Sequence, residues 1–255
     1  MKIKQLGILS GVALAATLGT AGAAQAALVV VPTDLLPGAQ YRLVFVTAGT
    51  RDAASLDIGP YNTFVTNQAT GGTPGIDTAL DTALNGAGFD LNTITWKAIG
   101  STESIDARDN TGTNPSSTGV PIYLIDGNRV ANNNADFWDG SLQHRINLQP
   151  NDVTTSADFV WTGSSSNGTG YDSSQLGGLY SQYVVVGRAD QTTNQWITYS
   201  SPDYFSNYRL YAMSSMLTVP GNQPAPVPVP EPASLLGYIT LGGLMLGSAV
   251  RKARK

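Results

Sequence analysis

The stretch Tyr41-Arg42-Leu43-Val44-Phe45-Val46-Thr47 is the longest candidate strand in this sequence. It is rich in β-branched and aromatic residues, which favour extended backbone in a sheet, so we expect a strand over 41–47. Shorter runs of similar composition predict further strands. These runs are Thr95–Ile99, Pro121–Ile125, Phe159–Thr162, Tyr183–Val186, Gln195–Tyr199 and Arg209–Met213. The pair Asp126-Gly127 after the second run predicts a hairpin turn.

Two segments between residues 58 and 86 have helical spacing instead. Their apolar residues recur at three- and four-residue intervals, which places them on one face of a helix. They are Ile58, Tyr61, Phe64 and Val65 in the first segment, and Ile76, Ala79, Leu80, Ala83 and Leu84 in the second, which Gly86 ends. The order of strand, two helices, strand, long loops and further strands predicts the α+β class. We expect two helices packed on a loop-rich antiparallel sheet.

The composition excludes several classes of protein. The sequence has no cysteine, which excludes a disulfide framework, thiol catalysis and cysteine-ligated metal. Of its 18 acidic and 14 basic residues, 17 and 8 lie between Ala27 and Val229, a net charge there of 8 − 17 = −9. A segment this acidic repels phosphate backbones, so we expect no nucleic-acid partner.

The N-terminus has the pattern of an export signal. Lys2 and Lys4 form a charged start, an apolar run follows, and Ala24-Gln25-Ala26 is a small-residue cleavage site. We therefore expect residues 1–26 to be a signal peptide. Signal peptidase would cut after Ala26, so that the mature chain starts at Ala27.

The C-terminus combines a proline-rich segment, an apolar run and a basic tail. We expect one domain over 27–220, followed by a proline-rich spacer over 221–229. Residues 233–250 are apolar, and a helix of that length spans roughly 27 Å, close to the ~30 Å of a bilayer core. The basic residues after Val250 would stay cytoplasmic. We therefore expect a transmembrane helix over 233–250 before any processing.

The segment 230–255 resembles the PEP-CTERM sorting signal of Gram-negative bacteria. The residues that match the motif of that family are Pro230, Glu231 and Pro232, followed by the apolar run and the basic tail. The resemblance implies that an exosortase-type membrane protease recognises the motif and cuts near it. The mature protein would then reach the cell surface, outer envelope or extracellular matrix. An ordinary C-terminal anchor that is never cut is the alternative.

The domain over 27–220 resembles the C-type-lectin-like fold, most nearly its endostatin-like branch. The resemblance rests on the segments 96–101, 120–130 and 159–164 and on the closing strand around Leu210-Tyr211-Ala212. It implies a domain that binds partners through its loops. Two features depart from the family pattern. The disulfides usual in that fold are absent, so aromatic packing must replace them, and the Trp-Asn-Asp calcium motif is missing.

Two pairs of aspartates are candidates for chemistry. Asp106 and Asp109 lie close in sequence, as do Asp136 and Asp139, and paired carboxylates can hydrolyse glycosidic bonds. Trp138 lies in a polar loop within the second pair. We expect it at the surface as a sugar platform, with Asp136 and Asp139 as ligand-binding neighbours, and core packing is the alternative for its ring. The other three tryptophans lie in strand patterns, where core packing is expected.

Calcium is the cofactor that the loop residues suit. Oxygen ligands from Asp106, Asp109 and Asn110 match the preference of a hard cation. The same residue types also make Asx turns, and the spacing of an EF-hand is missing. The only histidine, His144, lacks the Gly-x-Ser-x-Gly elbow of a serine hydrolase. No catalytic residue is therefore assigned, and both calcium binding and a turn role stay open for the three loop residues.

These observations favour an exported, non-enzymatic protein of the cell surface or exopolysaccharide matrix. It would bind a glycan or an envelope protein through the loops of its domain. Two alternatives remain open. One is a secreted hydrolase of polysaccharide that uses Asp106, Asp109 or Asp136. The other is a structural matrix component without a specific ligand.

Overall fold

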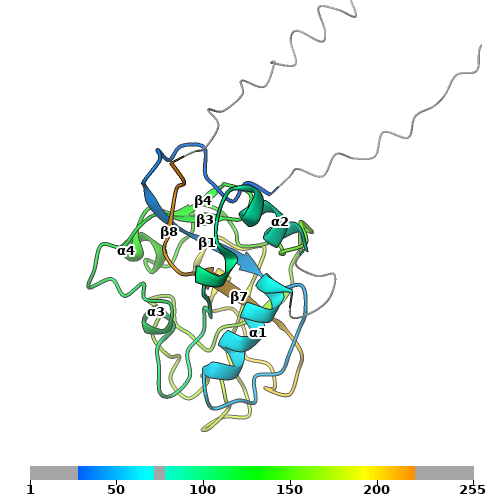
Figure 1. The fold of residues 1–255 in the computed structure, drawn as a ribbon. Coiled ribbons are helices and arrows are strands. Elements are labelled where there is room, and N and C mark those ends of the chain that lie inside the picture. The colour runs from blue at the N-terminus through cyan, green and yellow to red at the C-terminus, as the bar shows by residue number, and fades with distance from the viewer. Residues whose placement is uncertain (1–27, 72–77, 222–255) are drawn as a thin grey trace, which may run out of the picture.

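A computed structural model describes residues 28–71 and 78–221 (Figure 1). Within these two ranges no helix is both long and apolar enough to cross a bilayer. The predicted signal peptide, the Pro-Glu-Pro motif and the predicted transmembrane helix over 233–250 lie outside the described residues, as does all of the spacer after Gly221. The described part belongs to the α+β class, as the sequence predicts.

The strand β1, Gln40–Val46, confirms the predicted strand and lies at the centre of the sheet. Its side chains from Leu43 to Val46 are fully buried, so both faces of the strand are covered. It pairs in parallel with β3, Ile122–Leu124, and antiparallel with β7, Arg209–Ser214. The short β8, Leu217–Thr218, pairs with the start of β1.

The strand β7 connects the two halves of the sheet. Its second half pairs antiparallel with β2, Trp96–Ala98, and its first half pairs in parallel with β5, Phe159–Trp161. At the edges, β4, Arg129–Ala131, pairs with β3, and β6, Val186–Arg188, pairs with β5. The sheet order is β4-β3-β1-β7-β5-β6. Two further strands lie off this path, β2 paired with β7 and β8 paired with β1.

The sheet is therefore mixed, and the prediction of an antiparallel sheet is wrong for two of its pairings. Parallel neighbours require a crossover connection of a dozen or more residues. The chain provides one between β1 and β3, which includes both long helices, and another between β5 and β7. Composition and periodicity locate strands but carry no information on their direction.

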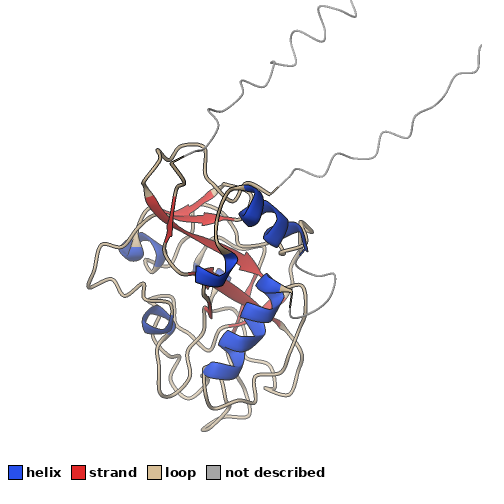
Figure 2. Cartoon of the chain, viewed as in Figure 1, coloured by secondary structure: helices blue, strands red, loops and turns tan. Residues whose placement is uncertain are grey.

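The two predicted helices are present. The helix α1, Gly59–Thr70, has Pro60 in its first turn, where proline is favoured. It is ended by Gly71, whose φ of 85° lies in the left-handed region and is incompatible with a continued α-helix. It packs on β2 and β7 and buries Tyr61, Val65 and Ala69 (Figures 1 and 2). The helix α2, Thr78–Gly86, confirms the second prediction, although Ile76 lies outside the described residues.

The remaining helices are short. They are α3, Ala107–Asn110, and α4, Asn134–Phe137, with the 3₁₀ turns η1, Leu91–Thr93, and η2, Asn194–Trp196. The turn η2 replaces the strand predicted over 195–199, and β6 begins only at the last residue of the predicted strand 183–186. These predictions are wrong because aromatic and β-branched residues favour burial in any backbone conformation, and Trp196 is fully buried.

Aromatic side chains fill the part of the core around η2. The ring of Trp196 lies 5.2 Å from Phe137, 6.0 Å from Trp138 and 5.7 Å from Tyr211, measured between ring centroids. Aromatic pairs at such distances contribute beyond the area they bury. In a chain without cysteine, this cluster contributes stabilisation that no disulfide can supply.

Both ends of the described chain lie at the end of the sheet where β1 begins (Figure 1). Gln40 of β1 pairs with Thr218, and the backbone N–H of Gly38 donates to the carbonyl of Val219 over 2.9 Å. The opposite end of the sheet is formed by Val46, the last residue of β1, and Arg209, the first of β7. The described chain thus begins and ends at one end of the domain, and the opposite end is the free end.

Replacement of Gly187 by alanine is expected to destabilise the domain. A Cβ at this position of β6 would overlap with the backbone carbonyl of Trp196, so β6 could no longer pack against the turn η2. We expect Gly187→Ala to lower the free energy of unfolding by about 3 kcal/mol or more, measured by urea unfolding. Gly86→Ala, at the open end of α2, is the control and should cost nothing. Equal free energies of unfolding for the two variants would contradict the close packing of β6 against η2.

Acid unfolding is expected to depend on Asp34. Tyr123 Oη and Arg129 Nη2 donate to Asp34 Oδ2 over 3.0 and 2.5 Å. Burial alone would raise the pKa of the Asp34 carboxyl, but these hydrogen bonds outweigh it and hold the pKa below its ordinary value. A depressed folded-state pKa gives stability that is present above the unfolded pKa of about 3.9 and is lost as the pH falls below it.

In Asp34→Asn, the loss of unfolding free energy between about pH 7 and about pH 2 should be smaller than in the parent. The difference should be at most ~1 kcal/mol, because both partners are partly exposed. Asp139→Asn, at an exposed loop carboxylate, is the charge-matched control. An identical pH profile for the two variants would rule out the role of Asp34.

Candidate functional site

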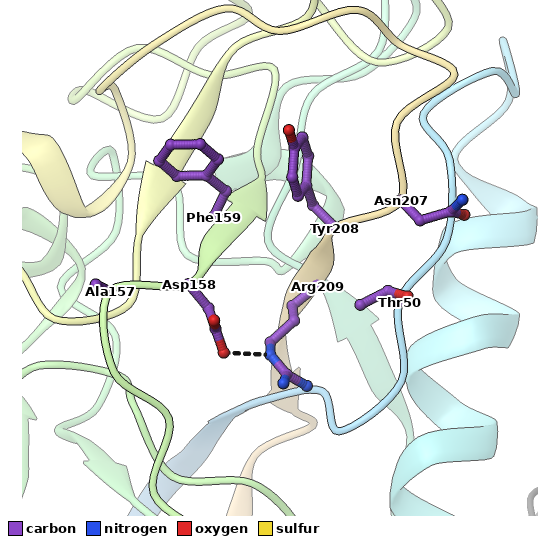
Figure 3. Close-up of a pocket in the computed structure, with 7 residues that line it drawn as sticks. All are labelled: Thr50, Ala157, Asp158, Phe159, Asn207, Tyr208 and Arg209. Carbon is purple, nitrogen blue, oxygen red and sulfur yellow. Dashed lines mark hydrogen bonds and ion pairs between the residues drawn. The ribbon is translucent and has the colours of Figure 1, made fainter.

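A pocket of about 280 Å³ lies at the free end of the sheet (Figure 3). It is bounded by the loop after β1, by the segment that leads into β5 and by the segment that leads into β7. Its lining residues are Thr50, Ala157, Asp158, Phe159, Asn207, Tyr208 and Arg209. The parallel pairing of β5 with β7, which places Val160 opposite Arg209, brings the last two segments together.

Arg209 fixes the polar side of the pocket. Its Nε donates to Asp158 Oδ2 over 2.8 Å, and its Nη1 donates to the carbonyl oxygens of Thr47, over 2.8 Å, and of Ala48. The hydroxyl of Thr155 donates to the same carboxylate oxygen of Asp158. One guanidinium therefore ties together the three segments that form the pocket, which a lysine with its single ammonium could not do.

The opposite side of the pocket is aromatic. The rings of Phe159 and Tyr208 meet edge to face with centroids 5.4 Å apart, and Tyr208 also contacts the buried Trp161 at 5.0 Å. Phe159 in turn packs against Tyr199 at 5.8 Å. Phe159 and Tyr208 are only partly buried, and Figure 3 shows both rings on the same side of the pocket. The pocket thus offers parts of two aromatic rings to a ligand.

The backbone around the pocket is fixed at two points. Thr50 and Tyr208 are held near each other because Arg51 and Tyr208 exchange two backbone hydrogen bonds of 3.0 Å each. Ala157 has a φ of 52°, in the left-handed region that costs a residue with a Cβ roughly 1 kcal/mol. Such strain is most often retained next to functional sites.

Several polar groups of the pocket are available to a ligand. Among residues 28–71 and 78–221, no side chain or backbone group is bonded to the side-chain amide of Asn207, the hydroxyl of Thr50 or Oδ1 of Asp158. Asn207 and Thr50 are exposed. An amide, a hydroxyl and a carboxylate oxygen beside two aromatic rings can bind a small polar ligand with one apolar face.

Trp138 does not lie where the sequence predicts it. Its side chain is 4% exposed, its indole N–H donates to both the carbonyl and the hydroxyl of Thr113 over 3.0 Å, and its ring packs against Gly168. The prediction of an exposed sugar platform is therefore wrong, and the alternative of core packing is correct. The ring turns inward because the cluster around Trp196 offers it apolar partners.

Asp136 and Asp139 shape the loops on either side of α4. Asp136 Oδ2 accepts hydrogen bonds from the backbone N–H of Asn132 and from Gln143, and Asp139 Oδ1 accepts from the N–H and hydroxyl of Ser141. Asp139 remains exposed, whereas the ring of Trp138 beside it is not. The two carboxylates and the indole therefore do not form the joint ligand site that the sequence suggests.

The three calcium candidates each have partners within the protein. Asp106 Oδ1 accepts from the N–H of Gly170 over 2.8 Å, and Asp109 Oδ1 accepts from the Asn114 amide over 2.6 Å. The amide of Asn110 donates to the carbonyl of Ala98 and to Asn62.

In the described parts of the chain, no group of three or more acidic, histidine or cysteine side chains could hold a metal ion. The contacts at these positions agree with the alternative role, which is fixing the turns around α3, and calcium binding stays a prediction. His144 is exposed.

The sequence pattern alone does not single out the pocket residues. Their signal would have been the pairs Asp158-Phe159 and Tyr208-Arg209, in which a charged residue and an aromatic residue adjoin at the start of a strand. Such pairs become a site only when their strands are neighbours, which requires the fold.

Comparison of the chain with models of protein families and with curated proteins finds no match.

Proposed function

We propose that this protein is a non-enzymatic component of the cell surface or exopolysaccharide matrix that binds a glycan in the pocket beside Arg209. The observation that carries the proposal is the pairing of two partly exposed aromatic rings, Phe159 and Tyr208, with the polar groups of Thr50, Asp158 and Asn207. A sugar ring has the matching chemistry, because its C–H face stacks on aromatic rings while its hydroxyls form hydrogen bonds at its edge.

The size of the pocket suits the binding of a single sugar residue of a longer polysaccharide. Pockets for drug-sized ligands are usually ≈ 300–1,000 Å³, and this one, at about 280 Å³, lies just below that range. One sugar residue of a polysaccharide would lie in it while the rest of the chain extends over the surface. The polar groups at the exposed side, Thr50 and Asn207, suit such an open arrangement.

The C-type-lectin-like resemblance supports the same function and remains part of the proposal. The α+β class and the loop-rich free end of the sheet are compatible with it. A lectin-like domain that lacks the calcium motif has to hold its sugar by stacking and direct hydrogen bonds, which are the groups that this pocket offers.

The position of the pocket suits a protein displayed by its ends. The described chain begins and ends at one end of the sheet and the pocket lies at the other, so a chain attached through the segment after Gly221 would direct the pocket away from the attachment. Export by a signal peptide and sorting by an exosortase-type protease at Pro230, Glu231 and Pro232 are parts of this proposal.

Binding of exopolysaccharide fragments is expected to depend on Tyr208. We expect Tyr208→Ala to weaken the binding of the organism's own exopolysaccharide at least about tenfold, and Asn207→Ala to weaken it several-fold, in isothermal titration calorimetry. Tyr171→Ala, an exposed tyrosine outside the pocket, is the control. Binding that is absent, or unaffected in both pocket variants, would contradict the proposal, and turnover of the polysaccharide would favour the hydrolase alternative.

Processing at both ends is expected in surface material. Intact-mass spectrometry should find chains that start at Ala27 and lack the segment 235–255, because signal peptidase and the sorting protease have both cut. Substitution of Glu231 by alanine should leave the C-terminal tail in place, and Glu103→Ala, which removes a glutamate of the domain, is the control. An intact tail in the parent protein would leave the plain anchor as the explanation.

A further inference from the structure

A second surface of the molecule exposes large apolar side chains in one place. It consists of loops around Ala53, 177–183 and 202–206, which we call the loop patch. Its exposed side chains, with the fraction accessible to solvent, are Leu56 (52%), Leu179 (49%), Tyr180 (65%), Tyr183 (53%) and Phe205 (65%). Exposure of this many large apolar groups together is uncommon on a monomer and marks interaction surfaces.

Backbone contacts hold the loops of the patch together. The N–H of Ala53 donates to the carbonyl of Tyr204 and the N–H of Gly177 donates to the carbonyl of Ala53, both over 2.8 Å. The N–H of Tyr204 donates to the carbonyl of Gln182 over 3.0 Å. These bonds fix the three loops relative to one another, so the patch is a single surface.

Close packing adds to this rigidity. Gly177, with a φ of 99°, passes so near Leu56 that a Cβ would lie 2.9 Å from its Cα, and the rings of Tyr204 and Phe205 are 4.1 Å apart. Surfaces that are ordered before binding lose less conformational entropy when a partner docks.

The composition of the loops is that of protein-binding loops. Residues 177–183 read GGLYSQY and residues 202–206 read PDYFS. Tyrosine, serine, glycine and asparagine dominate the binding loops of antibodies, where tyrosine supplies rigid contact area and the small polar residues adapt their hydrogen bonds. The tyrosines and Phe205 point to a protein partner more than to a sugar, because the apolar groups are spread over a surface instead of lining one ring-sized pocket.

Acidic side chains accompany the apolar ones. The hydroxyl of Tyr180 donates to the carboxylate of Glu103, and Gln182 donates to Asp203 Oδ2 over 3.0 Å. Asp57 is exposed next to Leu56. Arg51 is a basic residue two positions before Ala53 in the first loop of the patch. Its Nη2 lies 3.5 Å from Asp52 Oδ1 and its guanidinium lies over the ring of Tyr61, so its charge is already paired. The surface is therefore complementary to positive charge, and two copies of a domain with a net charge of −9 would repel each other here.

We propose that the loop patch docks a protein with a basic surface, whose lysine or arginine side chains stack on Tyr180 and Phe205 and pair with Glu103 and Asp203. Aromatic faces attract such cations, and neighbouring carboxylates strengthen the attraction. The patch lies outside the glycan pocket, so docking here does not depend on the proposed glycan binding.

The test measures binding of a labelled peptide of alternating arginine and glycine to the purified full chain by fluorescence anisotropy. We expect Tyr180→Ala and Phe205→Ala each to weaken binding at least about fivefold, and Glu103→Gln about threefold. Thermal unfolding should stay unchanged, because these side chains are exposed. Asp90→Asn, a matched loss of charge at η1, should have little effect, as should Tyr208→Ala in the glycan pocket.

The outcomes separate the explanations. Equal losses in Asp90→Asn and Glu103→Gln, with none in Tyr180→Ala and Phe205→Ala, would show attraction by overall charge alone and would overturn the proposal. It would also be overturned if the patch variants bound the peptide like the parent but lost affinity for a neutral polysaccharide, because the patch would then be a glycan surface. Loss of glycan binding in Tyr208→Ala with peptide binding intact would support two separate sites.

Discussion

The antiparallel pairing of β1 with β7 joins residues from the two ends of the described domain in the centre of its core. Val44, Phe45 and Val46 lie opposite Met213, Ala212 and Tyr211, and all six side chains are fully buried. The two strands are far apart in the sequence, so forming this pair closes almost the whole domain into one loop, at an entropic cost that burial must outweigh. With no disulfide in the chain, the apolar and aromatic side chains on both faces of these strands supply that stabilisation.

The same pair separates the two ends of the molecule. At one end, β8 and the segment before β1 bring the described chain termini together. At the other end, β1 stops at Val46 and β7 starts at Arg209, which bonds to the carbonyls just after β1 and to the carboxylate just before β5. The pocket therefore results from where the strands end, and its aromatic side follows from the residues next to those ends. In the display at the cell surface that we propose, the pocket would face outward.

The local sequence pattern predicted most of the helices and strands, whereas the direction of the strands and the positions of several side chains depend on contacts between distant residues. β1, β2, β3, β5, β7 and both long helices were predicted because periodicity and β-branched composition act within a few residues. The parallel pairings of β1 with β3 and β5 with β7 were missed because strand direction depends on crossover connections. The inward turn of Trp138 depends on Phe137 and Trp196, and the second of these lies far along the chain. The pocket was missed for a related reason, since Asp158 and Arg209 meet only when β5 pairs with β7.

Chemical-shift mapping by NMR of the labelled protein with fragments of its own exopolysaccharide would locate the bound sugar. If the sugar binds in the pocket, the amides of Thr50, Phe159 and Tyr208 shift together on titration, while those of β8 and of the loop around Trp138 stay unchanged. Shifts centred on residues 136–139, or no shift at the pocket at saturating fragment, would contradict binding in the pocket.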